Sequence, residues 1–166
     1  MAFDPAALTQ RQRAMWAAGD YPDIARTIEA VSHEVVAAVG VREGETLLDV
    51  ATGSGNAALE AARRGARVTG LDLTPELLET AKERAAAAQA DIELVHGDAQ
   101  ALPFADDSFE RVTSVFGAMF APDQPRAYQR PVHWPRIVLR SSAPALRSAA
   151  ANSLSPRRSA SSASFG

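Results

Sequence analysis

The fold is indicated first by one continuous stretch, Thr46-Leu47-Leu48-Asp49-Val50-Ala51-Thr52-Gly53-Ser54-Gly55-Asn56. An apolar run of strand length leads into a loop with two glycines, and a helical segment follows over residues 57–64. Glycine lets the backbone turn sharply and approach a ligand more closely than a side chain would permit. The stretch therefore predicts a strand, a ligand-binding loop and a helix, in that order.

The same alternation continues along the chain. A second strand is predicted over residues 67–72, followed by a helix from Pro75 to about Ala88 with Thr74 as its N-cap. A third strand is predicted over residues 92–96 and a fourth over residues 109–116. Short apolar strands in alternation with helices are typical of an α/β fold, a parallel sheet with helices on both faces.

The residues ahead of this core are predicted to be helical. The first twenty residues are rich in Ala, Gln and Arg and predict one or two short helical turns. From Ile24 onward, apolar residues recur at spacings of three and four, which predicts one amphipathic helix ended by Gly40. We expect one domain over residues 1–126, with N-terminal helices over 1–40 and the α/β core over 45–123.

Composition excludes several classes of site. The chain has 166 residues and no cysteine, which excludes disulfides, zinc–thiolate sites and a nucleophilic thiol. Its three histidines are scattered, so no metal site is expected. The N-terminus carries an acid where a secretory signal would carry positive charge, and no window approaches 18 uninterrupted apolar residues. We expect a cytoplasmic protein without a membrane span.

A pair of acidic residues accompanies the glycine loop. Asp72 closes the second predicted strand, where a carboxylate can accept hydrogen bonds from ribose hydroxyls. Gly53, Gly55 and Ala58 also satisfy the Gly-x-Gly-x-x-Gly/Ala pattern of dinucleotide-binding loops, so a nicotinamide cofactor competes for the same geometry. Asp49 argues against it, because a carboxylate there would repel a pyrophosphate but could pair with a cationic amino-acid group.

The chain resembles the class I methyltransferases that use S-adenosylmethionine (SAM), especially the small-molecule branch with the ubiquinone and menaquinone biosynthesis enzymes. Four linked segments carry the resemblance: Leu47-Leu48-Asp49-Val50-Ala51-Thr52-Gly53-Ser54-Gly55, Gly70-Leu71-Asp72-Leu73-Thr74, Gly97-Asp98-Ala99 with Leu102-Pro103-Phe104, and Phe109-Glu110-Arg111-Val112. The resemblance covers about half of the chain. It implies a Rossmann-like parallel sheet and SAM as the cofactor.

The resemblance also implies roles for individual residues. The first group, which would face the methionine part of SAM or form the glycine loop beside it, consists of Asp49, Ala51, Gly53, Ser54 and Gly55. The second group would bind the adenosine: Asp72 at the ribose hydroxyls, Leu73 beside the adenine, Asp98 at the adenine amino group and the backbone of Ala99 at the ring edge. Phe116, at the end of the fourth strand, would line the methyl-donor pocket.

The function implied is methyl transfer from SAM to a small-molecule acceptor, with no membrane or nucleic-acid partner. Two alternatives remain: an NAD(P)-dependent oxidoreductase, and a non-catalytic SAM-binding fragment. No catalytic residue is assigned, because His96 is better explained as a structural residue at a strand end. Trp16 and Tyr21 are candidates to cover the cofactor, or to anchor the N-terminal helix. Neither the acceptor nor the oligomeric state is indicated by the sequence.

The C-terminal quarter has a different composition. Residues 1–123 hold all 20 acidic side chains and carry a net charge of −10, whereas residues 124–166 carry +7. The resemblance ends near Arg126, and one further strand is predicted over residues 136–139. Our hypothesis is that residues 127–166 are a frameshifted or otherwise aberrant end, which would leave the sheet incomplete. The alternative is a genuine basic tail that binds nucleic acid or an acidic partner.

Overall fold

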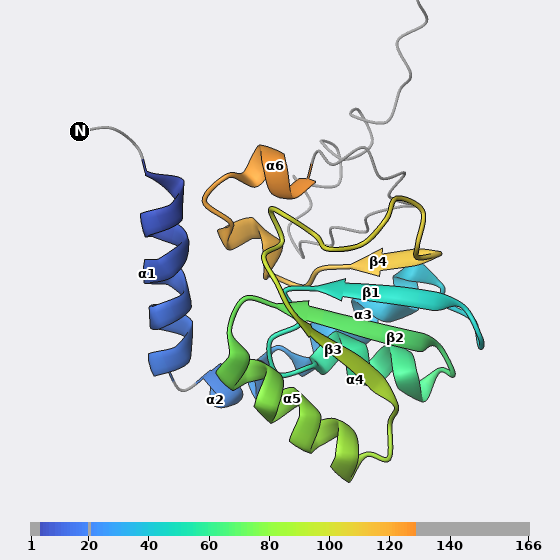
Figure 1. Ribbon diagram of the computed structural model, residues 1–166. Helices are drawn as coiled ribbons and strands as arrows, with labels where there is room; N and C mark the ends of the chain where they lie inside the picture. Colours follow the sequence, from blue (N-terminus) through green and yellow to red (C-terminus); the bar gives the residue numbers. More distant parts are fainter. Residues whose placement is uncertain (1–3, 20, 129–166) are drawn as a thin grey trace, which may run out of the picture.

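The computed structural model describes residues 4–19 and 21–128. A four-stranded parallel sheet lies at the centre, in the order β3-β2-β1-β4 (Figure 1). The strands are β1 (Thr46–Val50), β2 (Arg67–Asp72), β3 (Ile92–His96) and β4 (Arg111–Thr113). The pairing is parallel throughout, with Leu47 opposite Val68 and Val68 opposite Ile92. The predicted Rossmann-like parallel sheet is confirmed.

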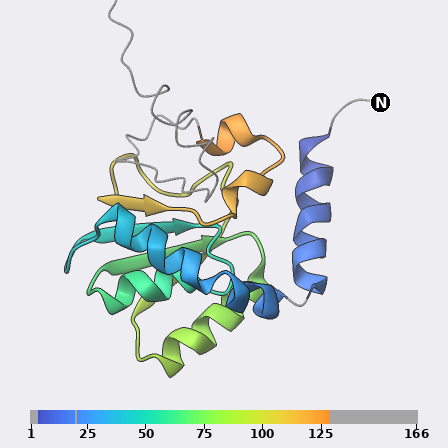
Figure 2. The same ribbon diagram turned by 180° about the vertical axis from the view of Figure 1, so that it is seen from behind.

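Seven helical segments accompany the sheet in the described residues: α1 (Pro5–Ala18), α2 (Tyr21–Thr27), α3 (Glu29–Val39), α4 (Asn56–Arg63), α5 (Pro75–Ala87), the 3-10 turn η1 (Ala118–Phe120) and α6 (Gln124–Tyr128). None of these helices has the length and apolar content needed to cross a membrane. The boundaries of β2, β3 and α5 agree with the predictions to within one residue. In both ribbon views, α1 stands beside the sheet, at the end toward which the strands point (Figures 1 and 2).

Two predictions about the N-terminal helices were wrong. The first is longer than one or two turns: Asp4 caps α1 by accepting hydrogen bonds from the backbone N–H groups of Ala6 and Ala7. The single amphipathic helix expected to end at Gly40 is broken at Ile28, between α2 and α3. The side-chain amide of Asn56 donates to the carbonyl oxygen of Ala25 at 2.7 Å, the oxygen that residue 29 would use in a continuous helix.

The fourth strand is shorter than predicted. It pairs with β1 over only three residues, from Arg111 opposite Leu47 to Thr113 opposite Asp49. Phe116 has φ of 62°, which takes the chain out of the extended conformation soon after the strand. The strand predicted over residues 136–139, and nearly all of the tail from residue 127, lie outside the described residues. The division of the chain near residue 126 therefore stays a prediction.

Strand alternation divides the core between the two faces of the sheet. Leu47 and Val68 pack with α3 and α4 on one face, where Val36, Ala58 and Ala61 are almost fully buried. Figure 2 shows α3 lying against the sheet on the side hidden in Figure 1. This layer of helices positions the loop between β1 and α4.

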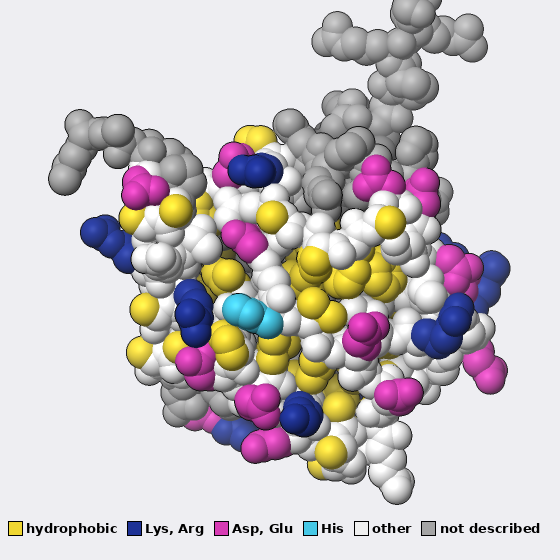
Figure 3. Space-filling view, viewed as in Figure 1, with side chains coloured by type: hydrophobic (Ala, Val, Ile, Leu, Met, Phe, Trp, Pro, Cys, Tyr) yellow, Lys and Arg dark blue, Asp and Glu magenta, His cyan; other side chains and the backbone are white. Residues whose placement is uncertain are grey.

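The second face is covered differently. Leu48, Val50 and Leu71 pack there with Leu102, and with partly buried side chains that include Phe104 and Phe109 of the β3–β4 connection. The rings of Phe104 and Phe109 meet edge to face with centroids 5.1 Å apart. Apolar side chains remain visible at the centre of this view of the molecule, with charged side chains around them (Figure 3).

Candidate functional site

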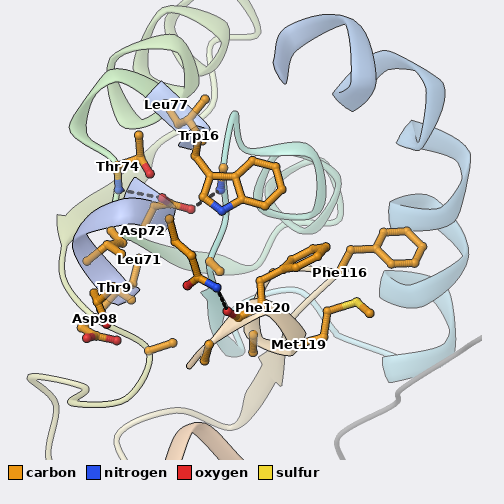
Figure 4. A pocket seen from close by; sticks show the side chains of 18 of the residues that line it. Thr9, Trp16, Leu71, Asp72, Thr74, Leu77, Asp98, Phe116, Met119 and Phe120 are labelled. Carbon is orange, nitrogen blue, oxygen red and sulfur yellow. Dashed lines mark hydrogen bonds between the residues drawn. The ribbon is translucent and has the colours of Figure 1, made fainter. Parts of the chain in front are cut away.

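One cavity of about 390 Å³ opens where β1, β2 and β3 end. Ligands in open parallel sheets bind at this edge, outside the carboxyl ends of the strands. Three loops form the inner wall, with Ala51 and Gly53 after β1, Asp72 to Thr74 after β2, and Gly97 to Gln100 after β3. The outer wall comes from α1, from α2 and the residue after it, and from residues 116–122 (Figure 4). Elements far apart in the sequence therefore enclose one site.

Asp72 joins two parts of the inner wall. Its Oδ2 accepts a hydrogen bond from the backbone N–H of Gly53 at 2.8 Å, and its Oδ1 accepts one from that of Thr74 at 2.8 Å. Burial raises the pKa of this carboxyl group, and the two backbone donors oppose the rise. The carboxylate lines the cavity and holds the glycine loop against the start of α5 (Figure 4).

The glycine loop approaches the cavity through its backbone. Ala51 and Gly53 both have φ of 56°, and both line the cavity. Gly55 does not line it: its φ is 85°, and an added Cβ would lie 3.3 Å from the Cβ of Ala81 on α5. Gly53 thus contributes to the site directly, whereas Gly55 allows α4 and α5 to pack closely.

Two other predicted site residues point away from the cavity. Ser54 is buried, and its carbonyl and hydroxyl oxygens accept hydrogen bonds from Nη1 of Arg84 at 2.8 and 3.1 Å. Asp49 is also buried and accepts hydrogen bonds from the hydroxyl groups of Thr52 and Thr113 at 2.7 and 2.9 Å. Loss of hydration raises the pKa of Asp49 to about 6, although both hydroxyl groups oppose the rise. Neither side chain lines the cavity.

The adenosine-binding residues expected from the resemblance do line it. Leu73, Asp98 and Ala99 all belong to the inner wall. Asp98 Oδ1 accepts hydrogen bonds from the backbone N–H of Gln100 at 2.8 Å and from its side-chain amide at 3.1 Å. His96 does not reach the cavity, because its Nε2 lies 3.1 Å from the carbonyl oxygen of Leu73. His96 is therefore not placed as a general base.

Residues after β4 close the cavity on another side. Phe116 lines it with the unusual φ of 62°. The next residue, Gly117, lies so close to β1 that an added Cβ would be 2.3 Å from the Cβ of Ala51. Gly117 and Ala51 therefore meet at a contact that only glycine permits, and both Ala51 and the neighbouring Phe116 have positive φ. Met119 and Phe120 follow as further lining residues.

Helix α1 reaches this wall from outside. Trp16 and Phe120 pack edge to face with ring centroids 5.2 Å apart, and the side-chain amide of Gln12 donates to the carbonyl oxygen of Phe120 (Figure 4). Thr9 also lines the cavity. The sequence indicated Trp16 as a candidate but gave no signal for Gln12, since α1 has no apolar periodicity, and none for Phe120 in η1. The side chain of Tyr21 lies outside the described part of the chain.

The charge of the cavity distinguishes between possible ligands. Asp72 and Asp98 are acidic, and no Lys, Arg or His side chain is among the described residues that line the cavity. A dinucleotide would bring a negatively charged pyrophosphate into a cavity lined by two carboxylates. The carboxylates fit a ligand with hydroxyl and amino donors and a net positive charge, as in SAM.

Comparisons with known proteins agree with this geometry. Residues 47–134 match the family model described as a methyltransferase domain. An uncharacterised protein from Mycobacterium tuberculosis is 49% identical over 121 residues, which cover 72% of this chain and 44% of that protein. A demethylmenaquinone methyltransferase from Staphylococcus aureus is 43% identical over 88 residues, 51% of this chain and 36% of the enzyme. The chain spans less than half the length of these curated relatives.

Solved structures show the same fold. The YcgJ protein of Bacillus subtilis is 28% identical, with a TM-score of 0.55 over 59% of this chain and 43% of that one. A Haloferax volcanii protein solved in complex with the Trm112 methyltransferase activator is 34% identical, with a TM-score of 0.55 over 69% of this chain and 51% of that one. The family match covers more than half of the chain, which therefore belongs to the class I methyltransferases that use S-adenosylmethionine as methyl donor.

Proposed function

We propose that this chain binds SAM in the cavity at the carboxyl ends of β1, β2 and β3, as the cofactor-binding part of a methyltransferase for a small-molecule acceptor. One observation carries the proposal: Asp72 and Asp98 line that cavity together, and no cationic side chain accompanies them among the described lining residues. The same observation disfavours an oxidoreductase with a nicotinamide dinucleotide.

The proposed contacts follow from the placement of each group. Asp72 would accept hydrogen bonds from the ribose hydroxyls, because each carboxylate oxygen has a second lone pair besides the one used by Gly53 or Thr74. Asp98 would accept from the adenine amino group, with Leu73 and the backbone of Ala99 at the ring. Ala51 and Gly53 would leave room for the methionine part. Asp49 would act from within the sheet through its charge, without touching the cofactor.

The protein would contribute to methyl transfer mainly by positioning SAM and the acceptor. SAM supplies a methyl group on a sulfonium leaving group, so in-line transfer depends mainly on orientation and exclusion of water. Trp16, Phe116 and Phe120 form an apolar wall on the outer side of the cavity. This wall would orient the acceptor and keep water away from the transferred group.

A small-molecule acceptor is supported by the demethylmenaquinone methyltransferase of Staphylococcus aureus among the relatives. The non-catalytic alternative is a chain that binds SAM but transfers no methyl group. Both forms of the proposal require the same cofactor site. Methyl transfer by the purified chain to candidate acceptors would separate them.

The site is tested by calorimetric titration of the full chain with S-adenosylhomocysteine, and with NAD as the control ligand. We expect binding of the first alone. Asp72→Asn should weaken binding about tenfold or more, because hydrogen bonds to a charged group contribute about 1.5–3 kcal/mol. Asp91→Asn, at an exposed acid before β3, is the matched control. A folded chain that binds NAD, or that binds neither ligand, would refute the proposal.

A further inference from the structure

Gln100 holds three parts of the cavity rim with one side chain. Its Nε2 donates to both carboxylate oxygens of Asp98, at 3.1 and 3.0 Å, and to the hydroxyl oxygen of Thr9 on α1, at 3.3 Å. Its Oε1 accepts a hydrogen bond from the backbone N–H of Asp123 at 2.9 Å. The carboxylate requires a donor and the backbone N–H requires an acceptor, so only one orientation of the amide satisfies both.

These partners belong to three segments that are far apart in the sequence. Asp98 follows β3, Asp123 precedes α6, and Thr9 lies on α1. Asp123 comes three residues after Phe120, whose ring contacts Trp16 and whose carbonyl oxygen accepts from Gln12. Gln100 therefore contacts α1 directly through Thr9. Through Asp123 it also holds the segment that carries Phe120, which is the second contact of α1.

We propose that Gln100 is a positioning residue that couples ligand binding at Asp98 to the docking of α1 over the cavity. This inference rests on the proposed function, because Asp98 is taken to bind the adenine amino group. The amide cannot turn toward one partner without losing another, so the carboxylate orientation and the position of α1 are linked. Such coupling is reciprocal: a ligand that stabilises Asp98 also stabilises docked α1.

Two substitutions separate the parts of this link. Gln100→Leu removes all side-chain hydrogen bonds, whereas Gln100→Glu keeps an acceptor for Asp123 and places a negative charge against Asp98. Gln10→Glu, at an exposed position of α1, is the matched control for the added charge. Thr9→Val removes the acceptor on α1 and leaves Gln100 and Asp98 in place, so it tests the link even if a Gln100 variant fails to fold.

Three measurements on the full chain test the proposal. These are the affinity for S-adenosylhomocysteine, the preference for it over S-inosylhomocysteine, which lacks the amino group, and hydrogen exchange of residues 5–18 with and without ligand. In the unmodified chain, ligand should slow exchange in α1. Both Gln100 variants should bind about tenfold more weakly and lose most of the preference. In these variants and in Thr9→Val, saturating ligand should no longer slow exchange in α1, whereas Gln10→Glu should behave like the unmodified chain.

The outcomes distinguish failure of the coupling through Gln100 from failure of the proposed function. Failure of the unmodified chain to bind S-adenosylhomocysteine would refute the proposed function, and this inference with it. Normal binding together with unchanged preference and unchanged α1 protection in the folded variants would overturn the coupling alone. A uniform loss of affinity with preference and α1 protection intact would show a structural role only, and would also overturn it.

Discussion

Replacing Asp49 by Asn should make the protein more stable at neutral pH. The carboxyl group is fully buried, and its pKa is raised from 3.8 to about 6, mainly by loss of hydration. Because the folded state holds this proton more tightly than the unfolded state, stability falls as pH rises from about 4 to about 6. The ionised group therefore costs the fold about 3 kcal/mol above pH 6, from about 1.4 kcal/mol for each pKa unit.

The asparagine variant has no such charge, and it can still exchange hydrogen bonds with the hydroxyl groups of Thr52 and Thr113. Urea denaturation at several pH values isolates the effect. The difference in unfolding free energy, variant minus unmodified chain, should increase by about 2 kcal/mol between pH 4.5 and pH 8. Any constant cost of the substitution cancels in this comparison. A difference that is independent of pH would refute the argument, because it would show that Asp49 titrates alike in the folded and unfolded chain.

Two further substitutions test the outer wall of the cavity. Gly117→Ala should lower the free energy of unfolding, measured by urea denaturation, by about 1–3 kcal/mol, because its Cβ would collide with Ala51. Gly19→Ala is the control and should be nearly neutral, because its Cβ meets only an ordinary contact. Equal effects of the two substitutions would contradict the packing argument. Trp16→Ala should accelerate hydrogen exchange in α1 several-fold by removing the edge-to-face contact with Phe120, worth about 0.5–1.5 kcal/mol. Unchanged exchange would show that this contact does not hold α1.

The parallel core could be predicted because its signals are local. The strand over residues 92–96 and the helix from Pro75 are bounded by turn and capping residues, and the structure places both there. The length of helix α1 was underestimated because apolar and polar residues are mixed on all its faces. Its N-terminal cap also depends on one residue, Asp4. The break at Ile28 gives no local signal in the sequence, and the side chain that binds the carbonyl oxygen of Ala25 there, Asn56, is distant in sequence.

The candidate site could be predicted only in part. Asp72 and Asp98 follow strands that the sequence indicates, so their convergence at one edge follows from the topology. The sequence does not distinguish a loop residue that faces the cavity from one that faces the core, and the structure turns Ser54 toward Arg84. The role of Gln100 was missed because its partners, Thr9 and Asp123, come together only through tertiary folding.

The double hydrogen bonding of Asp72 has a consequence for the kinetics of ligand binding. Both oxygens hold the backbone at Gly53 and Thr74 through hydrogen bonds within the chain itself. The glycine loop is thus set in shape when the protein folds, and an arriving ligand meets a rigid inner wall. Association at this wall should then proceed in a single step at a rate governed by diffusion into the cavity, with any slower second step belonging to α1.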